Sequence, residues 1–299
     1  ASFPMNLQQK VDTYLDSQRF LLSAGNLSLL DLQELCPICR GNKGSNFDFC
    51  YQCTGHIRNA GVNNWLLADR TAFICYGEAK GKDQLGSDMH NYKKNEIQQP
   101  LQSEAKRRIV SLLYHTFSHY WDEANTPEIT VLTAMPSLRD VNRNQLMQSV
   151  KNVASRLPNN LVVQQLLYPR ELRGNKERER VLDPQLFYVD SDQVGGHVVI
   201  VEDSWVTGAN AQSAAIALHQ AGADYVTILS VARLLYENVM DSFKLQEIIG
   251  LLLAGVLANP HFGLSLPTPR GSHQPHFVII KAYSVDGKED STAQINHDI

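Results

Sequence analysis

The sequence predicts an α/β protein with a parallel β-sheet covered by helices on both faces, preceded by a small cysteine-rich module. After residue 127, strand-like apolar runs alternate with helical patterns, as in parallel sheets. Residues 198–201 are continuously apolar, which is typical of a strand buried on both faces. Two CxxC pairs lie near the N-terminus. The predicted units are a helical N-terminal arm at 1–35, a cysteine module at 36–60 and the α/β domain at 61–299.

Composition indicates an ordinary folded globule. The 299 residues are 43% hydrophobic and 19% charged, which is enough apolar material for a sizeable core. The net charge of −4 argues against a whole-protein field that attracts nucleic acid, although local basic patches remain possible. We expect residues 1–4 to be a cloning remnant before Met5. No secretory signal follows, and the longest apolar run, Ile248–Ala258, is too short to span a bilayer. We therefore expect a soluble, cytoplasmic protein without a membrane span.

The N-terminal arm has helical spacing of apolar residues from Leu7 to Leu22. The pattern is interrupted near Gly25, and a second short helical run, Leu29–Leu35, leads into the cysteines. No residue type in the arm indicates chemistry, so we expect it to pack against the next module or a partner.

The two CxxC pairs are Cys36/Cys39 and Cys50/Cys53, and ten residues separate them. Each pair presents two thiolates from a tight turn, and two such turns close a tetrahedral Zn²⁺ site. Disulfides and free cysteines are the alternatives, but the lack of a secretory signal argues against disulfides. Because four thiolates leave no open coordination position, the predicted zinc is structural. His56 and Cys75 are nearby spare ligands, and the apolar surroundings of Cys75 favour a core position.

Between this module and the alternating region, residues 65–76 are expected to form one or two strands. Residues 77–94 are polar and rich in glycine and lysine, which predicts a basic loop. Gln102–Trp121 has helical spacing. His115 and His119 lie one turn apart on it, which suits a metal, but no carboxylate completes a known triad and a plain helix face is favoured.

The alternating region predicts strands at 129–134, 161–168, 186–189 and 224–232, and helices at 144–157 and 237–258, with a charged loop at 170–180. A last apolar run at 277–283 predicts one more strand.

The stretch with the clearest chemistry follows the apolar strand at 198–201. Glu202 and Asp203 come first, then a loop of mostly small residues, then a helical pattern. Unpaired N–H groups of such a loop and of the first helical turn bind phosphate, and Gly208 lets the backbone approach it. Thr207 and Asn210 add side-chain donors. The carboxylates would repel phosphate but are placed to accept hydrogen bonds from sugar hydroxyls. An ordinary strand-to-helix loop is the alternative.

A second strand-end turn, Met135–Arg139, follows the strand at 129–134. In parallel sheets, ligands bind beyond the carboxyl ends of the strands. The two turns are therefore expected to face one pocket.

The stretch Glu202–Asn210 resembles the phosphoribosyl-diphosphate (PRPP) loop of type I phosphoribosyltransferases, which reads acid-acid, two variable apolar residues, Thr-Thr-Gly-x-Thr. Three positions depart from that pattern: Trp205 stands where a smaller residue is usual, Val206 where a hydroxyl is usual, and Asn210 where Thr is usual.

From Cys36 to about Arg233, the chain is similar to the ComF family, which joins an N-terminal zinc ribbon to a type I phosphoribosyltransferase domain. Four segments carry the wider resemblance: Ala134–Ser137 at the pyrophosphate loop, Arg139–Gln145 at an Arg-rich segment, Arg170–Arg180 at the charged flexible segment, and Ser230–Arg233 at the strand ending in Ala-Arg.

The resemblance implies transfer of a 5-phosphoribosyl group from PRPP with release of pyrophosphate. It assigns the 5-phosphate to Thr207, Gly208, Ala209 and Asn210, the ribose hydroxyls to the candidate catalytic pair Glu202 and Asp203, and the pyrophosphate to Met135, Pro136, Ser137 and Arg139. Mg²⁺ would bridge ribose and pyrophosphate oxygens. No residue indicates the acceptor. The alternative is a non-catalytic ComF-like accessory protein that binds PRPP, a nucleotide or single-stranded DNA.

Overall fold

The computed structural model describes residues 5–17, 21–22, 36–39, 41, 43, 46–61, 66–78, 84–93, 99–119, 127–140, 144–159, 161–172, 181–189 and 194–235. The helices expected at 29–35 and 237–258, the strand expected at 277–283 and residues 173–180 of the charged loop lie outside these residues.

The described chain contains six helices and seven strands. They are α1 (Leu7–Asp16), β1 (Leu21–Leu22), α2 (Tyr51–Ala60), β2 (Arg70–Glu78), α3 (Gln84–Asn91), α4 (Gln99–His119), β3 (Ile129–Ala134), α5 (Gln145–Ala154), β4 (Leu167–Pro169), β5 (Phe187–Val189), β6 (His197–Trp205), α6 (Ala209–Gln220) and β7 (Tyr225–Leu235). The alternation of strands and helices predicted after residue 127 is confirmed.

The main sheet has the order β1-β2-β7-β6-β3, in which β2, β7, β6 and β3 run parallel and β1 is antiparallel. A parallel bridge between Leu132 and Val163 extends the sheet beyond β3. The chain thus moves from β3 outward to Val163 and returns on the other side of β3 as β6. The strand order reverses between β3 and β6, and such switch points open a ligand crevice at the carboxyl ends of the strands.

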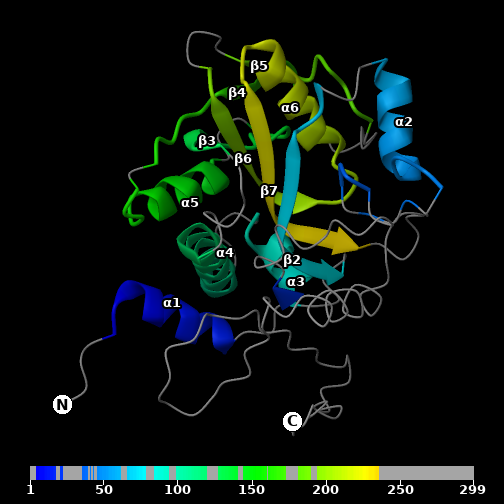
Figure 1. Cartoon of the computed structure of the whole chain (residues 1–299). Helices are drawn as coiled ribbons and strands as arrows, with labels where there is room; N and C mark the ends of the chain where they lie inside the picture. Colours follow the sequence, from blue (N-terminus) through cyan, green and yellow to red (C-terminus); the bar gives the residue numbers. More distant parts are fainter. Residues whose placement is uncertain are drawn as a thin grey trace, which may run out of the picture.

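Two hydrophobic cores cover the two faces of the sheet (Figure 1). One core joins the sheet to α3, α4 and α5, with α1 packed on the outside of α4. The other joins the opposite face to α6, the β4–β5 hairpin and all four cysteines of the CxxC pairs. Along β6, Val199 and Val201 belong to the first core and Val198 and Ile200 to the second, as strand alternation requires. The cysteine module therefore shares its apolar core with the sheet.

Three expectations for the elements are wrong. The helical pattern expected from Leu7 to Leu22 ends at Asp16, and Leu21–Leu22 form β1, which pairs with β2. The basic loop expected at 77–94 contains α3, because Leu85 and Met89 form a buried face against β2 and α4. Its Asp88 is buried and accepts two hydrogen bonds from Arg108 of α4. The strand expected at 161–168 is divided: only Val163 bridges to β3, and β4 turns away to form an antiparallel hairpin with β5.

His115 has a structural partner. Its Nδ1 lies 2.8 Å from Asp12 Oδ1 of α1, so this side chain ties the N-terminal helix to α4. This contact agrees with the expectation of a plain helix face.

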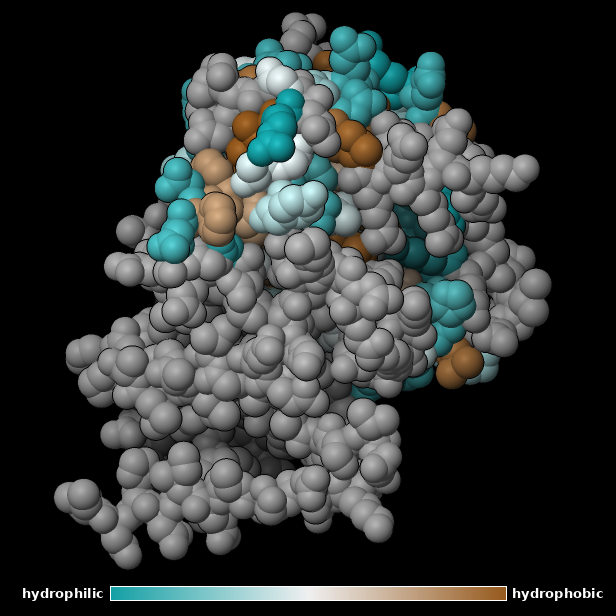
Figure 2. Space-filling view, turned by 90° about the vertical axis from the view of Figure 1, so that its right-hand side faces the viewer, coloured by the Kyte–Doolittle hydropathy of each residue, from teal (hydrophilic) through white to brown (hydrophobic). Residues whose placement is uncertain are grey.

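The surface on the α2 side shows hydrophobic residues as small separate spots among hydrophilic ones (Figure 2). The described residues of this face therefore do not form one extended apolar patch. Among the helices of the described ranges, none has the length and apolar character needed to cross a bilayer.

Candidate functional site

The end of β6 carries the acidic pair and leads into α6 through a short loop. Strand β6 extends to Trp205, so Glu202 and Asp203 lie within its last four residues rather than after it. Gly208 caps α6 with φ 76°. Thr207 and Asn210 are partly exposed, whereas Gly208 and Ala209 are buried. The predicted succession of strand, loop and helix is confirmed, with the acids inside the strand, and α6 begins at the carboxyl end of the sheet.

Trp205 lies directly beneath the loop. Its side chain is buried between the sheet and the loop, and a Cβ atom at Gly208 would overlap its indole ring. Glycine is therefore required at this position both by φ and by space. The indole of Trp205 thus packs directly against the loop at Gly208.

The two carboxylates face different surroundings, because consecutive strand residues point to opposite faces. Asp203 is partly exposed and pairs with Lys93, which follows α3, at 3.0 Å. It also accepts a hydrogen bond from Ser204 Oγ at 2.9 Å. Lys93 donates to the same Ser204 hydroxyl at 3.3 Å. Asp203 therefore forms an ion pair with Lys93 at a partly exposed position.

Glu202 is buried, and its Oε2 has no hydrogen-bond partner within the described part of the chain. Burial, and secondly the charge of Asp203, raise the pKa of Glu202 to about 8, and Lys93 and Arg233 offset part of this shift. The group is therefore mostly protonated at neutral pH. A buried carboxyl with an unused oxygen and a raised pKa, at the carboxyl edge of a parallel sheet, is a candidate functional group.

The turn after β3 starts beside the acidic pair. β3 and β6 pair in parallel up to Ala134 and Val201, and Met135 N–H donates to the Val201 carbonyl at 2.9 Å. Ser137 Oγ accepts from the N–H groups of Arg139 and Asp140, both at 3.3 Å, which fixes the turn. The Arg139 side chain is exposed. The two predicted strand-end segments thus leave neighbouring strands at one edge.

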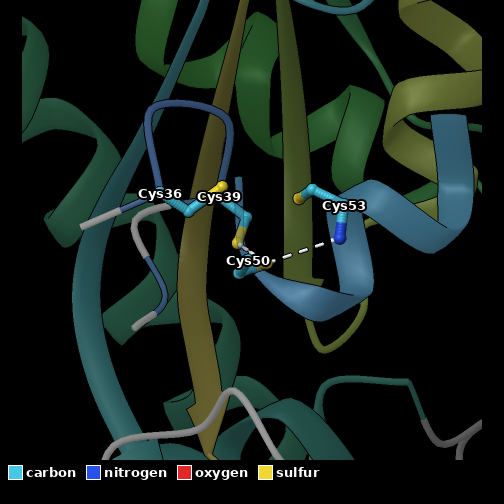
Figure 3. A group of neighbouring side chains, drawn as sticks. All are labelled: Cys36, Cys39, Cys50 and Cys53. Carbon is cyan, nitrogen blue, oxygen red and sulfur yellow. Dashed lines mark hydrogen bonds between the residues drawn. The ribbon is translucent and has the colours of Figure 1, made fainter. Parts of the chain in front are cut away.

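The four cysteines form a second site (Figure 3). Cys36 and Cys39 lie on a turn, while Cys50 caps α2 and Cys53 lies in its first helical turn. Their Sγ atoms all lie within 4.8 Å of one another, and all four residues are buried. Tetrahedral Zn²⁺ with bonds of about 2.3 Å separates its sulfur ligands by about 3.8 Å. The four thiols therefore fit a structural metal ion such as zinc.

The burial of the four cysteines also favours a cation at their centre. Four buried thiolates cannot coexist without a compensating charge, and a divalent cation would provide it.

Two side chains connect the cysteine site to the strand-end loop. His56, one turn after Cys53 on α2, places Nε2 3.2 Å from the carbonyl oxygen of Thr207. Arg233 at the end of β7 is buried, and its Nη2 lies 4.0 Å from Cys39 Sγ. Its guanidinium lies 5.8 Å from the centre of the Trp205 ring.

Sequence reasoning did not assign Lys93, Arg233 or a loop contact of His56 to the site. Arg233 had a usable signal: a cation that ends an apolar strand lies at the same edge as the acids that end its parallel neighbour. Lys93 belongs to the lysine-rich stretch 77–94, which could close over a phosphate-rich substrate, but its partner Asp203, like the Thr207 partner of His56, is distant in the sequence.

Comparison with known proteins finds no matching family model, no matching curated protein and no matching solved structure.

Proposed function

We propose that the chain is a ComF-like protein with a type I phosphoribosyltransferase-like fold, which binds PRPP with Mg²⁺ at the carboxyl edge between β3 and β6. One observation carries this proposal: an acidic pair and a glycine-capped helix start lie at the reversal of strand order, beside the turn after β3. An ordinary strand-to-helix connection needs neither buried Glu202 nor that position.

The 5-phosphate is assigned to the loop Val206–Asn210. Gly208 in the left-handed region lets the loop backbone lie close to the anion, and the first turn of α6 supplies N–H donors and the positive end of its dipole. Thr207 Oγ1 accepts only a long hydrogen bond from Ala209 N–H, at 3.4 Å, which leaves its own hydrogen for a phosphate oxygen. The hydrocarbon side chain of Val206 adds no side-chain donor, and it packs against the hydrophobic core.

The ribose hydroxyls are assigned to the acidic pair. Asp203 is the more accessible acceptor, and Lys93 stays close enough to offset its charge or to contact a phosphate. Glu202 lies deeper and would donate or accept according to its protonation. Mg²⁺ would neutralise charge on the pyrophosphate leaving group.

The pyrophosphate is assigned to the turn after β3, with Arg139 as the exposed cation at its rim.

In the transfer, a nucleophile forms a bond to ribose C1 while the bond from C1 to the pyrophosphate oxygen breaks and its electron pair leaves with pyrophosphate. Positive charge develops on the ring in between. The Asp203 carboxylate, held near the ring, would stabilise that charge. Zinc at the four cysteines has a structural role, and a reducing cytoplasm would keep those thiols free to bind it.

A pyrophosphate-release assay over candidate bases, with PRPP and Mg²⁺, tests whether the site turns over. In an enzyme, Asp203→Asn should lower turnover more than PRPP affinity, because the contact strengthens as charge develops on the ring. Binding without pyrophosphate release over all acceptors would place the chain with the accessory proteins instead.

One observation favours the second candidate, binding of single-stranded DNA. Tyr168 and Tyr188 stack on the β4–β5 hairpin with ring centres 5.2 Å apart, and both are exposed. The Arg170 guanidinium lies 6.0 Å from the centre of the Tyr188 ring. Exposed aromatic rings beside a cation are a surface on which bases stack. Binding of an oligonucleotide that weakens with salt and is lost in Tyr188→Ala would support this candidate, and unchanged binding in that variant would exclude this surface.

A further inference from the structure

We propose that the metal centre formed by the four cysteines holds the ligand loop Val206–Asn210 in its binding conformation, with His56 as the positioning residue. This inference rests on the proposed ligand site. It adds that metal occupancy sets the affinity of that site, although no cysteine touches the ligand.

His56 provides the direct connection. The side chain is buried at 6% exposure, and burial lowers its pKa, so the ring is neutral at physiological pH. Because a carbonyl can only accept, the ring must carry its proton on Nε2 and donate to Thr207 O. This bond directs the Thr207 carbonyl towards α2. The loop carbonyl is thus satisfied away from the crevice, where an oxygen would repel phosphate.

Arg233 provides a parallel connection. Its Nη2 lies 4.0 Å from Cys39 Sγ. The same guanidinium lies over the rings of Phe73 and Trp205, at 5.0 Å and 5.8 Å. The indole of Trp205 in turn supports Gly208. Contacts thus run from Cys39 through Arg233 and Trp205 to Gly208, so a fixed position of Cys39 also fixes the support of the loop.

The four cysteines bring together two separate segments of the chain, the turn of Cys36 and Cys39 and the start of α2. Cys50 caps α2 through a bond from Cys53 N–H at 3.4 Å, so two metal ligands define the start of the helix that carries His56. A single ion crosslinks this helix start to the turn of Cys36 and Cys39. Without the ion this crosslink is absent, and α2 would be held less firmly against the loop.

Three proteins test the coupling: the wild type, His56→Phe and His219→Phe. His56→Phe keeps an aromatic ring but removes the donor. His219 on α6 is the matched control, since it too is largely buried and contacts a backbone carbonyl, that of Ala223 at 3.1 Å, away from the loop. Each protein is prepared with zinc, and again after chelation and removal of the chelator. Zinc content, PRPP affinity with Mg²⁺ and hydrogen exchange of the amides of residues 207–211 are measured.

We expect His56→Phe to retain one zinc per chain and to lose about threefold to tenfold in PRPP affinity, the effect of one hydrogen bond. Metal-free wild type should lose at least as much, and removing the metal from His56→Phe should add little. His219→Phe should bind as the wild type does. Exchange at residues 207–211 should be faster both in metal-free wild type and in His56→Phe.

Equal exchange at residues 207–211 with and without zinc would overturn the inference, as would wild-type exchange in His56→Phe. If no protein binds PRPP, the proposed function fails, and hydrogen exchange still decides whether the metal centre positions the loop.

Discussion

Gly208 lies directly over the indole ring of Trp205, at φ 76°, so no larger residue fits between the acidic strand and α6. We predict that Gly208→Ala destabilises the protein by more than the roughly 1–2 kcal/mol of a left-handed alanine, because the methyl group also meets the ring. Gly61→Ala is the matched control: Gly61 has φ 62° and nothing within 4 Å of the added Cβ. Urea unfolding of both variants measures the difference.

Trp205→Leu should partly restore Gly208→Ala, since it removes the ring that the methyl group meets. A double-mutant cycle without coupling between the two positions would contradict the packing described for this loop.

The four-cysteine site predicts one zinc per chain. Cys53→Ser should bind little or no zinc, because three ligands close the site poorly. Cys75→Ser is the control: Cys75 is also buried, but it packs in the opposite core and is not among the four grouped cysteines. Elemental analysis of protein purified without chelator measures zinc content. Equal zinc in both variants would exclude the site.

Glu202 predicts a pH dependence of stability. Its pKa is raised from 4.5 to about 8, so between these values the folded protein holds a proton that the unfolded chain has lost. The free energy of unfolding should therefore fall as pH rises through this window, by up to about 1.4 kcal/mol per pH unit. Glu202→Gln lacks this contribution, so its stability relative to wild type should increase with pH.

Urea unfolding across that pH window measures this effect, with Glu128→Gln as a control at an exposed glutamate. Parallel pH profiles for wild type and Glu202→Gln would show that Glu202 ionises normally.

The contact between Asp88 and Arg108 predicts that α3 is essential for stability. Arg108 donates to both carboxylate oxygens of Asp88, at 2.7 and 2.6 Å, and Asp88 is 2% exposed. Asp88→Ala leaves a mostly buried guanidinium without its main partner and should cost about 3–5 kcal/mol. Glu104→Ala removes the exposed second acid of Arg108, at 3.6 Å, and should cost less than about 1 kcal/mol. Thermal or urea unfolding distinguishes these outcomes, and equal losses would contradict them.

The local parts of this architecture were predictable, and the long-range ones were not. The strand and helix around Glu202 and Gly208 follow from an apolar run, a glycine and a helical pattern that are contiguous in the sequence. The four cysteines were found because their spacing alone encodes the site. Helix α3 was missed because its pattern of small and polar residues with only two large apolar ones becomes a helix only when Leu85 and Met89 are buried.

The contacts that link the two sites could not be predicted. His56 and Thr207 are 151 positions apart, and Arg233 and Cys39 are 194 apart. Only the folded sheet brings them together.

Calorimetric titration of the zinc-loaded protein with PRPP and Mg²⁺ tests the central claim most directly. We predict saturable binding at one site. Thr207→Val should weaken it by about tenfold to a hundredfold, the effect of one charge-assisted hydrogen bond of about 1.5–3 kcal/mol. Thr207→Ser keeps the hydroxyl and should bind nearly as the wild type does. No binding to the wild type, or equal affinity in Thr207→Val, would mean that Glu202–Asn210 is only a structural connection between β6 and α6.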